Sequence, residues 1–172
     1  MRPFENRHPR RAAQDAMPGP DSKWLRLTAP AALFAVAVAV NYVWEIAQSF
    51  LFVGMGSLRA MWWHCFVASL GDGVILCIIH GVGWGVFRRV DWFARPGASQ
   101  YGVMLGAGLV IASVIEWLAV HVLHRWAYND LMPIVPGLEI GVIPLLQMLV
   151  LPPLAFMAVA KILGLPRPDP LH

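Results

Sequence analysis

The sequence predicts an all-α, polytopic integral membrane protein built as a bundle of four transmembrane helices. Hydrophobic residues make up 58% of the 172 positions and charged residues only 13%, whereas charged residues reach about 25% in soluble domains. Four apolar runs are each long enough for the roughly 20 residues that cross a bilayer. We expect a membrane domain over residues 24–163, with spans at about 30–53, 61–87, 101–123 and 138–163.

The segments beside these runs predict the topology. Residues 1–23 combine arginines, acids and prolines with almost no apolar periodicity, which is typical of a disordered tail, and residues 164–172 form a second polar tail. Six Lys and Arg residues precede the first span, three separate the second span from the third, and two lie near the end of the fourth. The positive-inside rule therefore places both termini in the cytoplasm. We expect the chain to cross the cell inner membrane four times. The preference for Arg over Lys suggests a bacterial source.

Small residues predict how the helices pack. Gly81 and Gly85 lie four residues apart in the second span, and Gly102 and Gly106 do so in the third, where Ala107 and Gly108 follow. Such spacing lets two helix backbones approach closely in lipid, so we expect packing surfaces there. Five aromatic residues near the ends of the spans are expected to anchor the helices at the interface: Trp24, Trp92, Tyr101, Trp126 and Tyr128.

The fourth span carries prolines inside an apolar run. Pro152 and Pro153 cannot donate backbone hydrogen bonds, so the carbonyl groups of Met148 and Leu149 lose their helical partners. We expect a kink in this helix. Irregular backbone within a membrane is tolerated where it is buried or lines a cavity.

Four polar side chains lie at a similar depth, one on each span: Glu45, Asp72, Glu116 and Gln147. A rise of about 1.5 Å per residue places them roughly 10–16 Å below the outer end of their helices. A carboxylate within the bilayer costs about 2.5–3.5 kcal/mol, which makes exposure to lipid unfavourable. We therefore expect the four groups to converge inside the bundle, with Glu45 and Glu116 facing one another and sharing a proton.

Other polar residues follow the same helix faces. Asn41 and Gln48 share a stripe with Glu45, His64 lies along the helix from Asp72, and His124 continues the face of Glu116. The candidate acid, base or ligand-anchoring residues are Glu45, Asp72, Glu116, His64 and His124. The candidate ligand-binding residues are Asn41, Gln48 and Gln147.

These residues favour a site near the outer leaflet that binds a small or lipophilic ligand, with acid–base chemistry on that ligand as one option. Two alternatives remain open. The protein could be a subunit of a proton-coupled transporter or channel, which would require oligomerisation because four helices leave little room for a pore. It could also be a non-catalytic assembly subunit whose polar groups only hold the helices in register.

Cofactors and partners follow from the same residues. The carboxyl and imidazole groups are acceptable metal ligands, but no HExxH or similar spacing is present, so we predict no cofactor and assign no metal ligands, and a bound metal ion stays open as an alternative. The basic residues flank apolar runs and do not form one basic face, which argues against a nucleic-acid partner. The expected partners are the lipid bilayer, a small or lipophilic ligand and, as an option, further copies of the chain.

Overall fold

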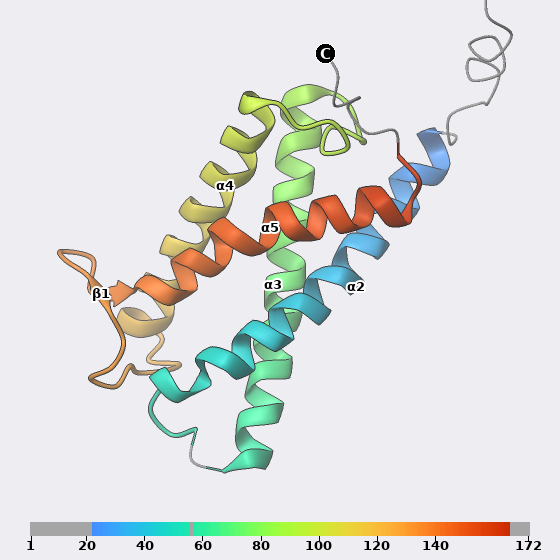
Figure 1. The fold of residues 1–172 in the computed structure, drawn as a ribbon. Helices are drawn as coiled ribbons and strands as arrows, with labels where there is room; N and C mark the ends of the chain where they lie inside the picture. The colour runs from blue at the N-terminus through green and yellow to red at the C-terminus, as the bar shows by residue number, and fades with distance from the viewer. Residues whose placement is uncertain (1–21, 56, 166–172) are drawn as a thin grey trace, which may run out of the picture.

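The computed structural model describes residues 22–55 and 57–165. Four helices make up most of this part of the chain: α2 (Ser22–Gln48), α3 (Leu58–Phe87), α4 (Ala98–Trp117) and α5 (Val142–Ile162) (Figure 1). Each is long and apolar enough to cross a membrane. A 3-10 turn, η1 (Ser49–Leu51), extends α2, and a π-helical turn, η2 (Leu118–Val122), extends α4. Two short antiparallel strands, β1 (Ile134–Val135) and β2 (Ile140–Gly141), precede α5.

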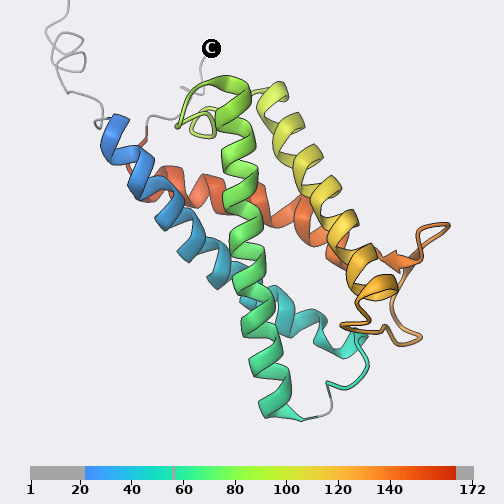
Figure 2. The same ribbon diagram turned by 180° about the vertical axis from the view of Figure 1, so that it is seen from behind.

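The helices are packed so that each has two main neighbours. Helix α2 packs on α3 and α5, and α4 packs on the same two helices, so α2 and α4 lie diagonally across the bundle. Figures 1 and 2 show α2 and α5 crossing α3 at an angle, while α3 and α4 diverge from the connection that joins them. Of the four neighbouring pairs, α3 and α4 share the fewest contacts.

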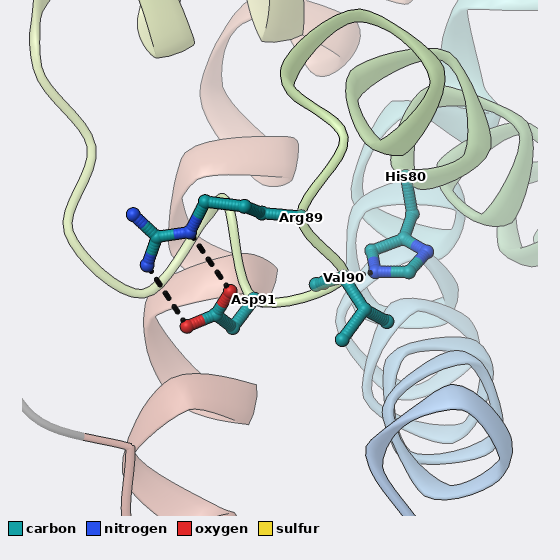
Figure 3. A network of polar contacts seen from close by, with 4 residues as sticks. All are labelled: His80, Arg89, Val90 and Asp91. Carbon is teal, nitrogen blue, oxygen red and sulfur yellow. Dashed lines mark hydrogen bonds and ion pairs between the residues drawn. The ribbon is translucent and has the colours of Figure 1, made fainter. Parts of the chain in front are cut away.

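The end of the bundle near residues 88–97 is closed by a buried aromatic cluster. His80, Trp92, Phe93 and Phe156 stack or meet edge to face, with ring centroids 5.1–6.3 Å apart. The Nε1 group of Trp92 donates a hydrogen bond to the carbonyl of His80 at 3.1 Å. The imidazole of His80 lies 3.0 Å from the carbonyl oxygen of Val90, as Figure 3 shows. This packing corrects the expectation that Trp92 is an interface anchor, because its side chain is only 3% exposed.

The same connection carries an exposed ion pair. Arg89 and Asp91 lie 3.1 Å apart between their nearest nitrogen and oxygen atoms (Figure 3). The hydrogen bonds and negative charge of Asp91 raise the pKa of Arg89 above its ordinary value. Arg88 adopts a left-handed conformation, with φ of 58°, and ends α3 there.

Two helix starts differ most from the expected ones. Helix α2 begins at Ser22, eight positions before the expected start, and contains Pro30 in its interior. A proline can be tolerated there when neighbouring helices stabilise the freed backbone groups. Helix α5 begins at Val142 because residues 138–141 belong to the turn and strand before it. Helix α5 is helical through Pro152 and Pro153, and the expected kink remains a prediction.

Of the five glycines expected to pack, Gly108 alone lies where a side chain would not fit. A Cβ atom on Gly81, Gly85, Gly102 or Gly106 would meet no atom within 4 Å, so no other helix occupies the space beside these four glycines in the described chain. Gly108 does lie against another helix. A Cβ atom there would lie 2.9 Å from the carbonyl oxygen of Met148, one of the two carbonyls that the prolines of α5 deprive of a helical partner. The close approach of α4 to α5 therefore depends on Gly108.

Candidate functional site

Gln147 on α5 connects three helices. Its Nε2 group donates hydrogen bonds to Asn41 Oδ1 at 2.7 Å, to Asp72 Oδ2 at 2.9 Å and to Glu45 Oε1 at 3.1 Å. Its Oε1 atom accepts from Gln48 Nε2 at 3.1 Å. We call the five residues Asn41, Glu45, Gln48, Asp72 and Gln147 the polar cluster. It brings together α2, α3 and α5 through one amide side chain that is only 2% exposed.

The α2 members of the polar cluster are ordered by helical spacing. Gln48 donates to Glu45 Oε1 at 2.8 Å, three residues away, and accepts from Trp44 Nε1 at 3.1 Å, four residues away. Side chains at these separations lie on one face of a helix. Asn41 is completely buried, and its amide nitrogen donates to the carbonyl of Ala37 at 2.8 Å. The Asn41 side chain is therefore held by its own helix and in turn holds the Gln147 amide.

Glu116 on α4 has a second set of partners. Its Oε1 atom accepts hydrogen bonds from the hydroxyl of Tyr128 and from Trp126 Nε1, the latter at 3.3 Å. The Tyr128 hydroxyl also accepts from the backbone N–H of Gly141 at 3.0 Å. Burial and the neighbouring Glu116 carboxyl raise the pKa of Tyr128 above its ordinary value. Tyr128 therefore keeps its proton at neutral pH and acts as a donor to Glu116.

Trp126 and Tyr128 belong to a segment, residues 124–133, that we call the strap. The strap is attached to the end of α2 by backbone hydrogen bonds: Val53 N–H donates to the Ala127 carbonyl at 2.9 Å, and Asn129 N–H donates to the Leu51 carbonyl at 3.0 Å. The amide of Asn129 adds a bond to the Phe50 carbonyl at 2.6 Å. The strap thus joins the ends of α2 and α4, which are not main packing neighbours, and holds its aromatic donors over Glu116.

A cavity of about 870 Å³ lies between the polar cluster, α4 and the strap. This volume falls in the upper part of the range of about 300–1,000 Å³ that is usual for small-molecule sites. Its polar lining includes the three carboxyl groups together with Gln48, Gln147, His64, Arg125 and Trp126. The apolar lining comes mainly from α3 and α4: Val67, Ala68, Gly71, Val74, Ile75, Ile78, Ala112 and Ile115. The cavity therefore has one polar end and long apolar walls.

Each of the three carboxyl groups has one oxygen without a hydrogen bond to the protein. The protein donors reach Oε1 of Glu45, Oδ2 of Asp72 and Oε1 of Glu116, and none reaches the other oxygen of each group. Among the described residues, no fully buried side-chain oxygen or nitrogen lacks a partner. The three remaining oxygens are therefore accessible, and we place them at the cavity because their residues line it.

Acidic side chains outnumber basic ones in the cavity. It contains three carboxyl groups and one guanidinium, that of Arg125, and no ion pair joins Arg125 or His64 to any of these carboxyl groups. Within residues 22–55 and 57–165, no group of three or more His, Cys, Asp or Glu side chains is placed to hold a metal ion. The carboxyl groups are hydrogen-bonded by neutral donors and are not neutralised by a protein cation.

The structure brings together most of the predicted site residues. Glu45, Asp72, Glu116 and Gln147, which the sequence places at a similar depth, all line the cavity, and Gln48 lines it as well. Glu45 and Glu116 share the cavity but not their hydrogen-bond partners, and proton sharing between them remains a prediction.

The two histidines are placed differently. His64 lines the cavity from α3, but its Nδ1 atom lies 2.8 Å from the carbonyl of Ala60 on its own helix. His124 does not line the cavity, which corrects the expectation that it continues the face of Glu116. The π-helical turn from Leu118 to Val122 changes the helical register, and His124 follows with φ of 48°. Its Nδ1 atom lies 3.1 Å from the Val120 carbonyl.

Sequence reasoning missed the donors of the strap. Trp126 and Tyr128 were expected to be interface anchors, whereas both bond Glu116, and Arg125 beside them lines the cavity. Their clustering was the available signal, because Arg125, Trp126 and Tyr128 fall within four consecutive positions of one connection. The backbone hydrogen bonds between this connection and the end of α2 join segments far apart in the sequence, so no local sequence pattern predicts them.

Comparisons of the chain with protein-family models, with curated proteins and with solved structures find no match.

Proposed function

We propose that the chain is a four-span integral membrane protein that binds a small lipophilic ligand in the cavity between α3, α4 and the polar cluster. The four helices would cross the inner membrane with both termini in the cytoplasm, and the strap would lie near the outer leaflet. Glu45, Asp72 and Glu116 would anchor the polar group of the ligand. The same carboxyl groups are the acid–base candidates if the ligand is also transformed.

The observation that carries this proposal is the cavity with accessible carboxyl oxygens at one end and apolar walls along its length. Ligand pockets are usually apolar with a few converging polar groups, and carboxyl groups within a membrane are functional candidates by default. A polar group of the ligand would bond the free oxygens while its apolar body contacts residues of α3 and α4.

The alternative functions receive less support. A proton-coupled transporter would be favoured by polar groups that continue from Asp72 toward His80. Helix α3 instead carries Ile75, Leu76 and Ile79 between them, all buried, and His80 is held against the carbonyl of Val90. A purely structural role would be favoured by carboxyl groups without a cavity beside them, but these groups line one.

Native mass spectrometry of the protein released from its own membranes tests the proposal. Gly71 lines the cavity, and a Cβ atom on it would meet nothing within 4 Å, so Gly71→Leu would fill space in the cavity without a backbone clash. Gly81→Leu is the matched control, because Gly81 is on the same helix and equally free of contacts but does not line the cavity.

We expect the wild-type protein and Gly81→Leu to retain a bound small molecule that Gly71→Leu loses. Equal retention in both variants would contradict the assignment of the cavity. If all three proteins are released under mild conditions, remain folded and carry no bound molecule, a structural role would be favoured.

A further inference from the structure

Resting on the function proposed above, we infer that the ligand is a lipophilic amine, with an ammonium group bonded to the free carboxyl oxygens and an apolar body that enters between α3 and α4. Three features of the cavity support this inference. The hydrogen-bond donors that reach the carboxyl groups are already engaged, no protein cation in the cavity is ion-paired with these groups, and the apolar wall is exposed.

The donors beside the carboxyl groups are already used. Gln147 Nε2 carries two hydrogens and faces three acceptors, and Gln48 Nε2 faces two. Trp126 and Tyr128 both donate to one oxygen of Glu116. The groups left over on the three carboxyl residues are therefore acceptor oxygens, and Arg125 and His64, which also line the cavity, bond none of these carboxyl groups. A ligand group that donates several hydrogen bonds complements them, and a primary ammonium has three N–H donors for three free oxygens.

Charge favours the same class of ligand. Hydrogen bonds from amide, indole and phenol groups stabilise a carboxylate, but they do not neutralise it. The cavity contains three carboxyl groups, and its guanidinium, on Arg125, is exposed and not ion-paired with any of them. A buried carboxyl group without a cationic partner favours its neutral, protonated form, and an ammonium ligand would stabilise the carboxylate instead by supplying a counter-charge.

The apolar wall is open to the side of the bundle. Val67, Val74 and Ile78 on α3 line the cavity and are 44%, 52% and 48% exposed, and Ile115 across from them on α4 is 40% exposed. Residues that line a cavity and are also exposed on the helix surface mark its opening. This opening lies between α3 and α4, the neighbouring pair with the fewest contacts, which Figure 2 shows diverging toward this end. In a bilayer the opening would face lipid, from which an amphiphile could enter.

The test compares two probes that differ in one group. Purified protein in phosphatidylcholine nanodiscs would be titrated with radiolabelled n-dodecylamine and, separately, n-dodecanol, with empty nanodiscs subtracting the partition into lipid. We expect dodecylamine to bind about tenfold or more tightly than dodecanol, because hydrogen bonds to charged groups are about twice as strong as neutral ones. This comparison uses the wild-type chain and needs no variant.

Variants then locate the binding. Asp72→Asn keeps the shape of the side chain and its bond to Gln147 while removing the charge, and it should weaken dodecylamine binding by about tenfold. Asp91→Asn, which changes a carboxyl outside the cavity at the other end of the bundle, should leave binding unchanged. Equal affinity for amine and alcohol, or no effect of Asp72→Asn, would overturn the amine assignment but leave a lipophilic-ligand site in place. Binding of neither probe would overturn the proposed function as well.

Discussion

Gln147 is the residue on which the polar cluster depends. It bonds one side chain of α3 and three of α2, and it is almost fully buried. Replacing it with Leu would leave the oxygen of fully buried Asn41 without its donor. An unsatisfied buried polar group costs about 1–3 kcal/mol, and hydrogen bonds between helices in lipid average somewhat less than in water.

We therefore expect Gln147→Leu to lower the free energy of unfolding by about 2 kcal/mol in detergent denaturation. The control is Gln100→Leu, which removes an exposed cap at the start of α4, where Gln100 Oε1 accepts from Gly97 N–H. Loss of such a cap costs about 1 kcal/mol or less in most cases. An unfolding free energy for Gln147→Leu equal to that of wild type would mean that the polar cluster does not hold the helices together.

Residue-scale prediction succeeded where helices are regular and failed where they are not. The positions of Glu45 and Gln48 on one face follow from a spacing of three residues, and the structure confirms their shared face. His124 was misplaced because its expected position assumed a continuous α-helix through residues 118–122, where the chain forms a π-helical turn. The sequence of the segment Leu118–Val122 contains no pattern that predicts a π-helical turn.

At the scale of helices, the contact between α4 and α5 distinguishes one glycine from its neighbours. Gly108→Ala would place a Cβ atom 2.9 Å from the backbone carbonyl of Met148, and a backbone atom cannot move aside as a flexible side chain can. Gly106→Ala meets nothing within 4 Å and gains helix propensity of about 1 kcal/mol.

We expect Gly108→Ala to destabilise the protein by about 1–3 kcal/mol and Gly106→Ala to leave it as stable as wild type or more so. Thermal unfolding followed by circular dichroism measures both. Destabilisation by Gly106→Ala that depends on protein concentration would instead place Gly106 in a contact between copies of the chain.

The helices were predictable as elements because each apolar run exceeds the length that a bilayer requires. Their packing partners were less predictable. Glycine spacing suggested contacts at Gly81, Gly85, Gly102, Gly106 and Gly108, and of these Gly108 is the one without room for a Cβ atom. A glycine pattern does not say which face of a helix meets another helix. The early start of α2 was missed because Pro30 was taken to begin the helix, whereas the chain is helical on both sides of it.

At the scale of the whole molecule, the proposed topology assigns the 88–97 connection and the strap to opposite sides of the membrane. In a background with Cys65→Ala and Cys77→Ala, single cysteines at exposed Ser99 and Asp130 report on these two sides. A membrane-impermeant maleimide added to intact cells should label Asp130→Cys and should label Ser99→Cys only after lysis. The opposite pattern would reverse the orientation, and labelling of both before lysis would contradict a four-span topology.

The central claim is that the carboxyl groups around the polar cluster are reached from lipid through the opening between α3 and α4. Dicyclohexylcarbodiimide partitions into membranes and adds to a carboxyl group to form a stable N-acylurea, which peptide mass spectrometry detects. Membranes containing wild-type protein, Gly71→Leu or Gly81→Leu would be treated in parallel, with and without n-dodecylamine.

We predict adducts on Glu45, Asp72 or Glu116 in the wild-type protein and in Gly81→Leu. The adducts should be reduced about tenfold by Gly71→Leu, which narrows the cavity, and by dodecylamine, whose ammonium would carry charge-assisted hydrogen bonds to the same oxygens. Equal labelling of all three proteins, or adducts confined to exposed carboxyl groups such as Asp91 and Asp130, would contradict a ligand cavity open to lipid.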